Sequence, residues 1–341
     1  FFYLFSNKRG YLYYDEKDFE RISEFVYRNL KPLKYLTRLK RKYIEDYFQK
    51  AEIYKEKLAE KPFRVMSTKE LILMFQSART LMGLGVGYGH LCEALSFGSE
   101  QMLKKILAQK KAFSHQIFSK LTSPTVPSFL HAVQEFLWRI RHSRGISRKR
   151  LIGKFLLSYP WIENSYLGPR TLTPKQVLER ARSQEKPQSK SIFASLRHKK
   201  ESLMQRLRFS AKERVVVQVI EFCTIWQDER KTRILESIGR LELVIRETAK
   251  RIGVKPNVLK FMLPREINPK KLFDKNFIKQ IQKRYPQAAY YTRFSDDQVF
   301  VGRAFEIFHK ALEVKVDESI REVHGVTASP GKAIGKARVC R

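Results

Sequence analysis

Residues 210–252 constrain the fold of this chain more than any other stretch, because they predict one very long amphipathic helix. Ser210 and Glu213 stand at the spacing of a capping box, which marks a helix start. No Gly or Pro occurs between them and Gly239, and Gly253 supplies a helix stop. One face of this helix is expected in a core, because apolar residues recur every three or four positions, at Val219, Cys223, Trp226, Ile234, Ile238, Leu241, Ile245 and Ile252.

Further stretches predict helices of the same kind. Asp15 can cap a helix that Pro32 interrupts, and Ser67 and Glu70 form a second capping box directly before an apolar run. These patterns predict a mainly α fold, a multi-helix bundle. Residues 33–60 carry a single stripe with the same spacing, made of Leu36, Leu39, Tyr43, Tyr47, Ala51, Tyr54 and Leu58.

Strand patterns stand out near the two ends of the chain. Residues 1–14 predict two aromatic strands around a polar loop, a small β-hairpin that can be the tail of a preceding domain. Residues 290–302 predict a second hairpin, and a helix from Arg303 to Leu312 follows it. We therefore expect the bundle to carry a small N-terminal β-hairpin and a short α/β segment near its C-terminal end.

Alternating glycines from Gly83 to Gly89 raise the choice between a phosphate-binding loop and a packing motif. No strand precedes them, and the dinucleotide-binding spacing G-x-G-x-x-G is absent. We therefore favour glycines that let two helices approach closely or that break a helix. His90 follows directly, and the sequence places no partners nearby that would make it a ligand.

Arg230 interrupts the apolar stripe of the longest helix. Together with its neighbours in residues 227–231 it forms the densest polar cluster on a helix that otherwise looks buried. Two interpretations follow. The cluster can bind a phosphate group or a partner domain, or Arg230 can pair with a neighbouring carboxylate and be structural, which is the commoner case.

The formal net charge of the chain is +34, with 68 Lys and Arg against 34 Asp and Glu. Such an excess favours anionic partners, among them nucleic acid. The basic residues are interspersed along predicted helices and form no basic tail, as in residues 38–42, 148–150 and 197–200. Solvated helix faces explain this pattern slightly better than a nucleic-acid surface does.

The three cysteines, Cys92, Cys223 and Cys340, lie far apart and lack metal-binding spacing. We expect no disulfide framework and no metal site, and a reducing, cytoplasmic environment is the natural interpretation. The most apolar window, residues 71–98, contains charged side chains, so it falls short of the roughly 20 apolar residues that a membrane helix needs. No membrane partner is expected.

Residues 323–340 predict a strand, a tight turn at Ser329, Pro330 and Gly331, and a second strand. Gly331 and Lys332 invite comparison with a nucleotide-binding P-loop. That interpretation is rejected, because Gly325 is one residue too far upstream and no hydroxyl residue follows Lys332.

This turn resembles the opening of the swivelling phosphohistidine domain in the phosphoenolpyruvate-utilising enzymes, the family of phosphoenolpyruvate synthase (pyruvate, water dikinase). Two more stretches, residues 159–169 and residues 261–267, are diffusely similar to segments of the same family. The sharp resemblance covers ten positions of the turn: Gly325, Ala328, Ser329, Pro330, Gly331, Ala333, Gly335, Ala337, Arg338 and Val339.

The resemblance implies a phosphotransferase in which a His on the swivelling domain carries phosphoryl from an ATP site to a pyruvate site. That His is expected beyond Arg341, and His324 is not its equivalent. The chain starts at Phe1 without Met and stops within the second predicted strand, so it is expected to be part of a longer protein. ATP, Mg²⁺ and pyruvate or phosphoenolpyruvate are implied for that whole protein, with no cofactor in this chain and no catalytic residue assigned to it.

Within this picture the chain is a helical scaffold, and its partners are the swivelling and nucleotide-binding domains of the same enzyme. The alternative is a basic helical nucleic-acid-binding protein, for which Tyr43, Tyr47 and Tyr54 would be aromatic platforms; their place on the apolar stripe favours the core instead. A helical adaptor without a ligand is a third possibility. The predicted domains are a hairpin at 1–14, a helical domain at 15–184, a linker at 185–190, a long-helix region at 191–285, a hairpin, helix and hinge at 286–322, and the first strands of the swivelling domain at 323–341.

Overall fold

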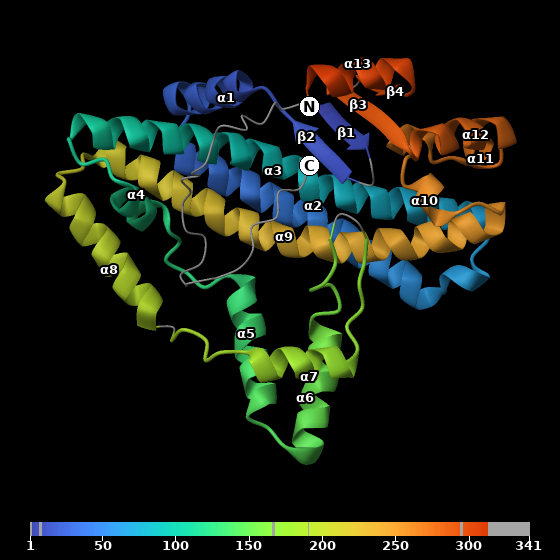
Figure 1. Ribbon diagram of the computed structural model, residues 1–341, viewed down its shortest axis with the longest axis horizontal. Coiled ribbons are helices and arrows are strands. Elements are labelled where there is room, and N and C mark those ends of the chain that lie inside the picture. The colour runs from blue at the N-terminus through green and yellow to red at the C-terminus, as the bar shows by residue number, and fades with distance from the viewer. Residues whose placement is uncertain (1, 7–8, 166–167, 190, 294–295, 313–341) are drawn as a thin grey trace.

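The computed structural model describes residues 2–6, 9–165, 168–189, 191–293 and 296–312, and it is built around two antiparallel helices of 42 residues each (Figure 1). These are α3 (Thr68–Gln109) and α9 (Ala211–Ile252). Helix α2 (Pro32–Glu60) packs on both of them, and α1 (Glu16–Asn29) packs on α3. The predicted mainly α bundle is therefore confirmed.

Shorter elements surround this central group. Two helices, α4 (His115–Thr122) and α8 (Ser191–Arg206), lie near one end of it, and α5, α6 and α7 project from its side (Figure 1). The projecting helices are α5 (Phe129–Arg141), α6 (Gly145–Ser158) and α7 (Pro174–Ser183). The remaining helical segments are η1 (Phe63–Val65), α10 (Pro256–Leu259), η2 (Pro264–Glu266), α11 (Pro269–Leu272), α12 (Lys275–Arg284) and α13 (Arg303–Ala311).

The helix ends follow the local signals in the sequence. Ser67 and Ser210 accept hydrogen bonds from the backbone N–H groups of Glu70 and Glu213, and both capping boxes are complete. Each box satisfies two N–H groups that a helix start otherwise leaves unpaired. Gly253 ends α9 with a φ of +70°, in the left-handed region that only Gly adopts without strain.

The tyrosines of α2 belong to the core. Tyr43, Tyr47 and Tyr54 are buried against α3 and α9, and the Tyr47 hydroxyl hydrogen-bonds with the hydroxyl of Ser237 at 2.9 Å. Burial supplies most of the stabilisation here, since a buried aromatic side chain removes a large apolar area from water. The expectation that the stripe of α2 faces the core is confirmed.

The glycines of α3 bring it close to α9. Helix α3 is continuous through them, so they do not break it. Gly85 faces Ile234, and Gly89 faces the guanidinium of Arg230, so closely that an added methyl group at position 89 would overlap it. Of the two roles favoured from the sequence, close helix approach is confirmed.

Four antiparallel strands form one sheet in the order β2-β1-β3-β4. Both predicted hairpins are present, and they are joined because β1 pairs with β3, with Leu4 opposite Ala289. The N-terminal hairpin is thus integrated with residues almost 300 positions away. The strands are β1 (Phe2–Ser6), β2 (Arg9–Tyr13), β3 (Gln287–Arg293) and β4 (Asp296–Phe300).

Two alanine substitutions in α3 test the close approach of the helices. Gly87→Ala is expected to raise the free energy of unfolding by about 0.5 to 1 kcal/mol, because Gly87 is exposed, its new methyl group meets nothing, and Ala is the better helix former. Gly89→Ala is expected to lower it by about 2 to 3 kcal/mol, because it displaces the buried Arg230. Urea unfolding measures both, and equal effects would contradict the packing.

Candidate functional site

The residues predicted to open the swivelling domain lie outside the described residues, as do His324 and the predicted hinge. The sequence prediction for them therefore stays a prediction. Along the chain, the last described element before them is α13, which packs on the four-stranded sheet. We call α13 and the sheet together the sheet seat. The predicted residues concerned are Gly325, Ala328, Ser329, Pro330, Gly331, Gly335, Ala337 and Arg338.

The sheet seat has its own small core. Leu4 from β1, Ala289 from β3 and Phe305 from α13 are each at most 1% exposed and contact one another. The rings of Phe300 and Phe308 pack beside them, with centroids 4.8 Å apart. Burial of Phe305 holds α13 against the sheet, so the last described helix is fixed at the point where the chain continues toward residue 313.

The sheet seat is tied to the bundle through residues 261–267. The Tyr290 hydroxyl donates a hydrogen bond to the carbonyl oxygen of Phe261 at 3.2 Å, and the Phe5 ring meets the Phe261 ring edge-on at 4.8 Å. Arg79 of α3 lies near Asp297 of β4. Burial lowers the pKa of Arg79, and the negative charge of Asp297 opposes that shift.

A buried ion pair orders the segment that leads to the seat. The Glu266 carboxylate accepts hydrogen bonds from both terminal nitrogens of Arg284, at 2.7 and 2.9 Å. It also accepts the backbone N–H of Leu263 at 2.8 Å, and Arg284 donates to the Phe261 carbonyl at 3.1 Å. Such a two-pronged pair fixes geometry as well as contributing energy. The sequence marked Glu266 through the family resemblance but gave no signal for Arg284 as its partner.

The polar cluster on α9 is divided among three neighbouring helices. Asp228 accepts the backbone N–H of Phe129 at the start of α5, at 2.9 Å. Glu229 forms an ion pair with Lys40 of α2 at 2.6 Å, although its side chain is half exposed. Arg230 turns inward to α3. Consecutive helical residues point about 100° apart, so one short stretch can reach three helices. We call these three residues the polar hub.

Arg230 is a structural residue, paired with a carboxylate of another helix. Its side chain is only 9% exposed and donates to Glu93 at 2.6 Å and to the carbonyl oxygen of Val86 at 3.0 Å. Burial alone raises the pKa of Glu93. The hydrogen bond with His90 and the charge of Arg230 outweigh that effect and leave the pKa below its usual range. These contacts turn the Arg230 guanidinium into the interface between α3 and α9. It therefore does not point to the surface, where a phosphate group could bind.

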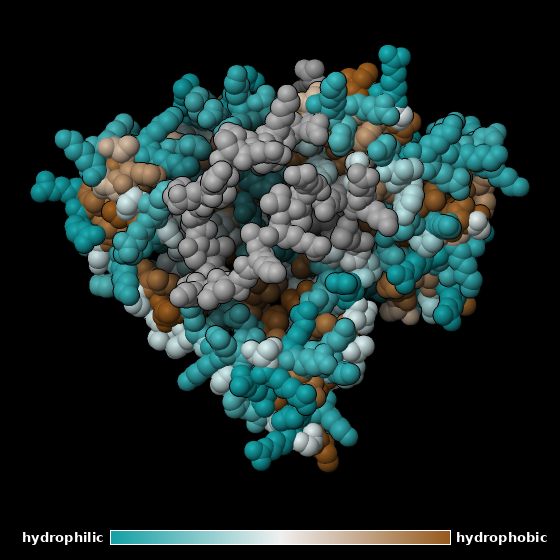
Figure 2. All heavy atoms as spheres, in the orientation of Figure 1, coloured by the Kyte–Doolittle hydropathy of each residue, from teal (hydrophilic) through white to brown (hydrophobic). Residues whose placement is uncertain are grey.

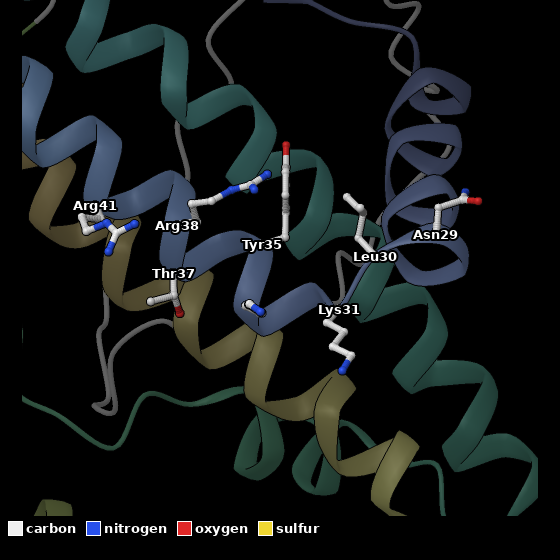
Figure 3. Close-up of a pocket in the computed structure, with 8 residues that line it drawn as sticks. Asn29, Leu30, Lys31, Tyr35, Thr37, Arg38 and Arg41 are labelled. Atoms are coloured by element: carbon white, nitrogen blue, oxygen red, sulfur yellow. The ribbon is translucent and has the colours of Figure 1, made fainter.

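A basic pocket of about 660 Å³ lies where α1 meets α2 (Figure 3). The labelled side chains come from the end of α1 and the first turns of α2. Its described lining contains four cations and no carboxylate, so its charge favours an anionic occupant. The only sequence signal for it was the basic run at 38–42. The lining residues are Asn29, Leu30, Lys31, Lys34, Tyr35, Thr37, Arg38 and Arg41.

No group of three or more His, Cys, Asp or Glu among the described residues is arranged to hold a metal ion. Among the same residues, no helix combines the length and the apolar composition required to cross a bilayer. Cys92 and Cys223 are both buried between α3 and α9, and the Cys92 thiol donates to the Cys223 carbonyl at 3.4 Å.

No family model matches the sequence, and neither the curated proteins nor the solved structures give a match.

Truncation of Phe305 tests the core of the sheet seat. Phe305→Ala is expected to reduce the stability of the seat by about 3 kcal/mol, because a fully buried ring is removed and a cavity remains. Ile307→Ala on the same helix is the matched control, since Ile307 is 62% exposed, and it should change stability by less than about 0.5 kcal/mol. Hydrogen exchange of the β3 amides reports the difference. Unchanged β3 protection in Phe305→Ala would contradict a seat held by this side chain.

Acid titration tests the pairing of Glu93 with Arg230. Glu93→Gln should lower the free energy of unfolding at pH 7 by about 2 kcal/mol, because Arg230 keeps its charge without a carboxylate partner. Because the folded-state pKa of Glu93 is lowered, its contribution is complete above the ordinary value of 4.5 and is lost as the pH falls through the folded-state value. The difference between wild type and variant should therefore shrink below pH 4.5 in urea titrations. A difference that does not depend on pH would show that the carboxylate charge is not involved.

Proposed function

We propose that this chain is the helical scaffold of a phosphoenolpyruvate synthase-like phosphotransferase and that it holds the hinge of a mobile phosphohistidine domain. The observation that carries the proposal is the run of ten positions between Gly325 and Val339 that follow the opening turn of that domain. The fold supplies supporting context, because a helical bundle and then a hairpin and helix precede the turn in the chain.

The sheet seat supports the scaffold role. A phosphoryl group on a His side chain cannot diffuse between two active sites by itself, so the domain that carries it must move. Such a domain needs a firm attachment and a pliable connection. The attachment proposed here is α13, which Phe305 fixes to a sheet made from two strands within residues 2–13 and two within residues 287–300. The connection proposed here is the polar segment 313–322, which lies between α13 and the turn in the sequence.

The chemistry of the proposed enzyme belongs to the whole protein. ATP, Mg²⁺ and pyruvate or phosphoenolpyruvate would bind to other domains, and the phosphoryl-accepting His would follow Arg341. No described residue is assigned a catalytic role in this proposal. A cytoplasmic location is part of it, in keeping with the two unpaired, buried cysteines.

The alternative, a basic nucleic-acid-binding protein, loses its aromatic platforms. Tyr43, Tyr47 and Tyr54 lie at most 3% exposed in the core, where no base can stack on them. What remains in its favour is the excess of positive charge at the surface, which is independent of the scaffold role.

Phosphoryl labelling tests the proposed function directly. The protein expressed from the complete gene is incubated with phosphoenolpyruvate labelled with ³²P, and protein-bound label is measured after acid and after alkali. A phosphoramidate bond to His is expected, recognised by label that alkali leaves and acid removes, with pyruvate released in equal amount. Absence of bound label, or label stable to acid, contradicts the proposal. Pyruvate formation without protein-bound label would also contradict it.

A further inference from the structure

Helices α5 and α6 form an antiparallel pair that projects from the side of the bundle (Figure 1). We call α5, the turn at 142–144 and α6 the basic prong. In Figure 1 the turn between the two helices is the lowest point of the molecule, and α7 crosses the pair nearer to the bundle. Figure 2 shows that this projecting part is mostly hydrophilic at its surface.

The basic prong is firmly attached. Its interior is a separate apolar cluster that includes Ile140, Ile152 and Phe155, with Val177 from α7. The loop that follows α6 returns to the bundle, where Trp161 packs on α9. Asn164 in the same loop donates to the carbonyl oxygen of Leu235 at 2.8 Å. The surface that the prong presents is therefore held in one orientation relative to the long helices.

The prong carries a strong excess of positive charge. The prong, residues 129–158, contains seven Lys and Arg and one acidic residue, Glu135, which lies 3.4 Å from His131. The whole chain has two basic residues for each acidic one, 68 to 34. None of the seven forms an ion pair with a described residue, although ion pairs occur on α1, α2 and α9. All but Arg148 are exposed. The seven are Arg139, Arg141, Arg144, Arg148, Lys149, Arg150 and Lys154.

Unpaired like charges on a rigid protrusion repel one another, and an extended anion relieves that repulsion. Arg148, Lys149 and Arg150 are consecutive, so their side chains point about 100° apart and surround α6 instead of lining one face. A helix that lies on a bilayer needs a continuous apolar face opposite its cations. The exposed apolar residues of α6, Ile146 and Leu157, share their face with the exposed Arg150, so no such continuous face forms. A chain of phosphates that passes around the tip suits this arrangement of cations better.

The aromatic residue of the tip has its own partners. Trp138 is half-buried, with the His142 ring 4.0 Å from its centroid and the Arg141 guanidinium 5.5 Å away. A ring that already has these neighbours is a poor platform for a base. The contacts available at the tip are therefore to phosphates, which carry no sequence information.

We propose that the basic prong binds the phosphate backbone of nucleic acid without sequence preference. This inference does not rest on the proposed phosphotransferase role, since it concerns a surface far along the chain from the sheet seat. The arginine-rich composition fits it, because guanidinium groups match the geometry of phosphate oxygens.

The test is binding of the full chain to a fluorescent DNA duplex of about 20 base pairs, measured by anisotropy from about 50 to about 200 mM salt. The triple variant Arg144→Ala, Lys149→Ala, Arg150→Ala removes three exposed cations from the tip. For this variant, the slope of log affinity against log salt concentration is expected to be smaller in magnitude by about 2 to 3. Each phosphate contact contributes about 0.9 to that slope. Circular dichroism verifies that the variant is folded.

A matched control removes three cations elsewhere. Lys275→Ala, Lys279→Ala, Lys283→Ala acts on exposed residues of α12 and should leave the slope nearly unchanged. An equal loss of slope in both variants overturns the proposal, because binding would then follow net charge alone. Two further results would overturn the proposal. In one, the wild-type chain does not bind the duplex at about 50 mM salt; in the other, it binds vesicles of anionic phospholipid but not the duplex.

Discussion

The structure depends on the fit of one buried guanidinium into a gap on the facing helix. Gly89 leaves that gap on α3, and Arg230 fills it from α9 while pairing with Glu93 at 2.6 Å. Burying an arginine is costly unless its hydrogen bonds are met, and a carboxylate and backbone carbonyls meet most of them here. Helices α3 and α9 also lie close together elsewhere in their interface, where the Cys92 thiol donates to the carbonyl oxygen of Cys223.

Helices α3 and α9, joined in this way, position the other parts of the molecule. Through the polar hub, Asp228 fixes the start of α5 and Glu229 contacts α2, so the same turn of α9 positions three helices. In the view of Figure 1 the sheet seat lies at the top of the molecule and the basic prong projects from the bottom, with the long helices between them. A rigid frame with two separate attachments is what a scaffold between moving or binding parts requires, and both proposed roles rest on it.

Whether a feature of this fold could be predicted from the sequence depends on how far apart along the chain its interacting residues lie. Capping boxes at Ser67 and Ser210 and the stripe of α2 act over a few residues, so the sequence was enough to predict them. The partner of Arg230 could not be predicted this way. Asp228 and Glu229 are its nearest acids in sequence, yet the helical turn directs them to other helices, and Glu93 is 137 residues away. The pairing of β1 with β3 was missed for the same reason, because a strand pattern does not reveal which distant strand completes the sheet.

A double-mutant cycle between Gly89→Ala and Arg230→Ala tests the central fit most directly. If the methyl group at position 89 is costly because Arg230 occupies the gap, the same substitution should cost almost nothing, or stabilise the helix slightly, once Arg230 is shortened. The predicted coupling free energy from urea unfolding is about 2 kcal/mol or more. Additive effects of the two substitutions would show that the gap and the guanidinium are independent, and would contradict this account of how α3 and α9 are joined.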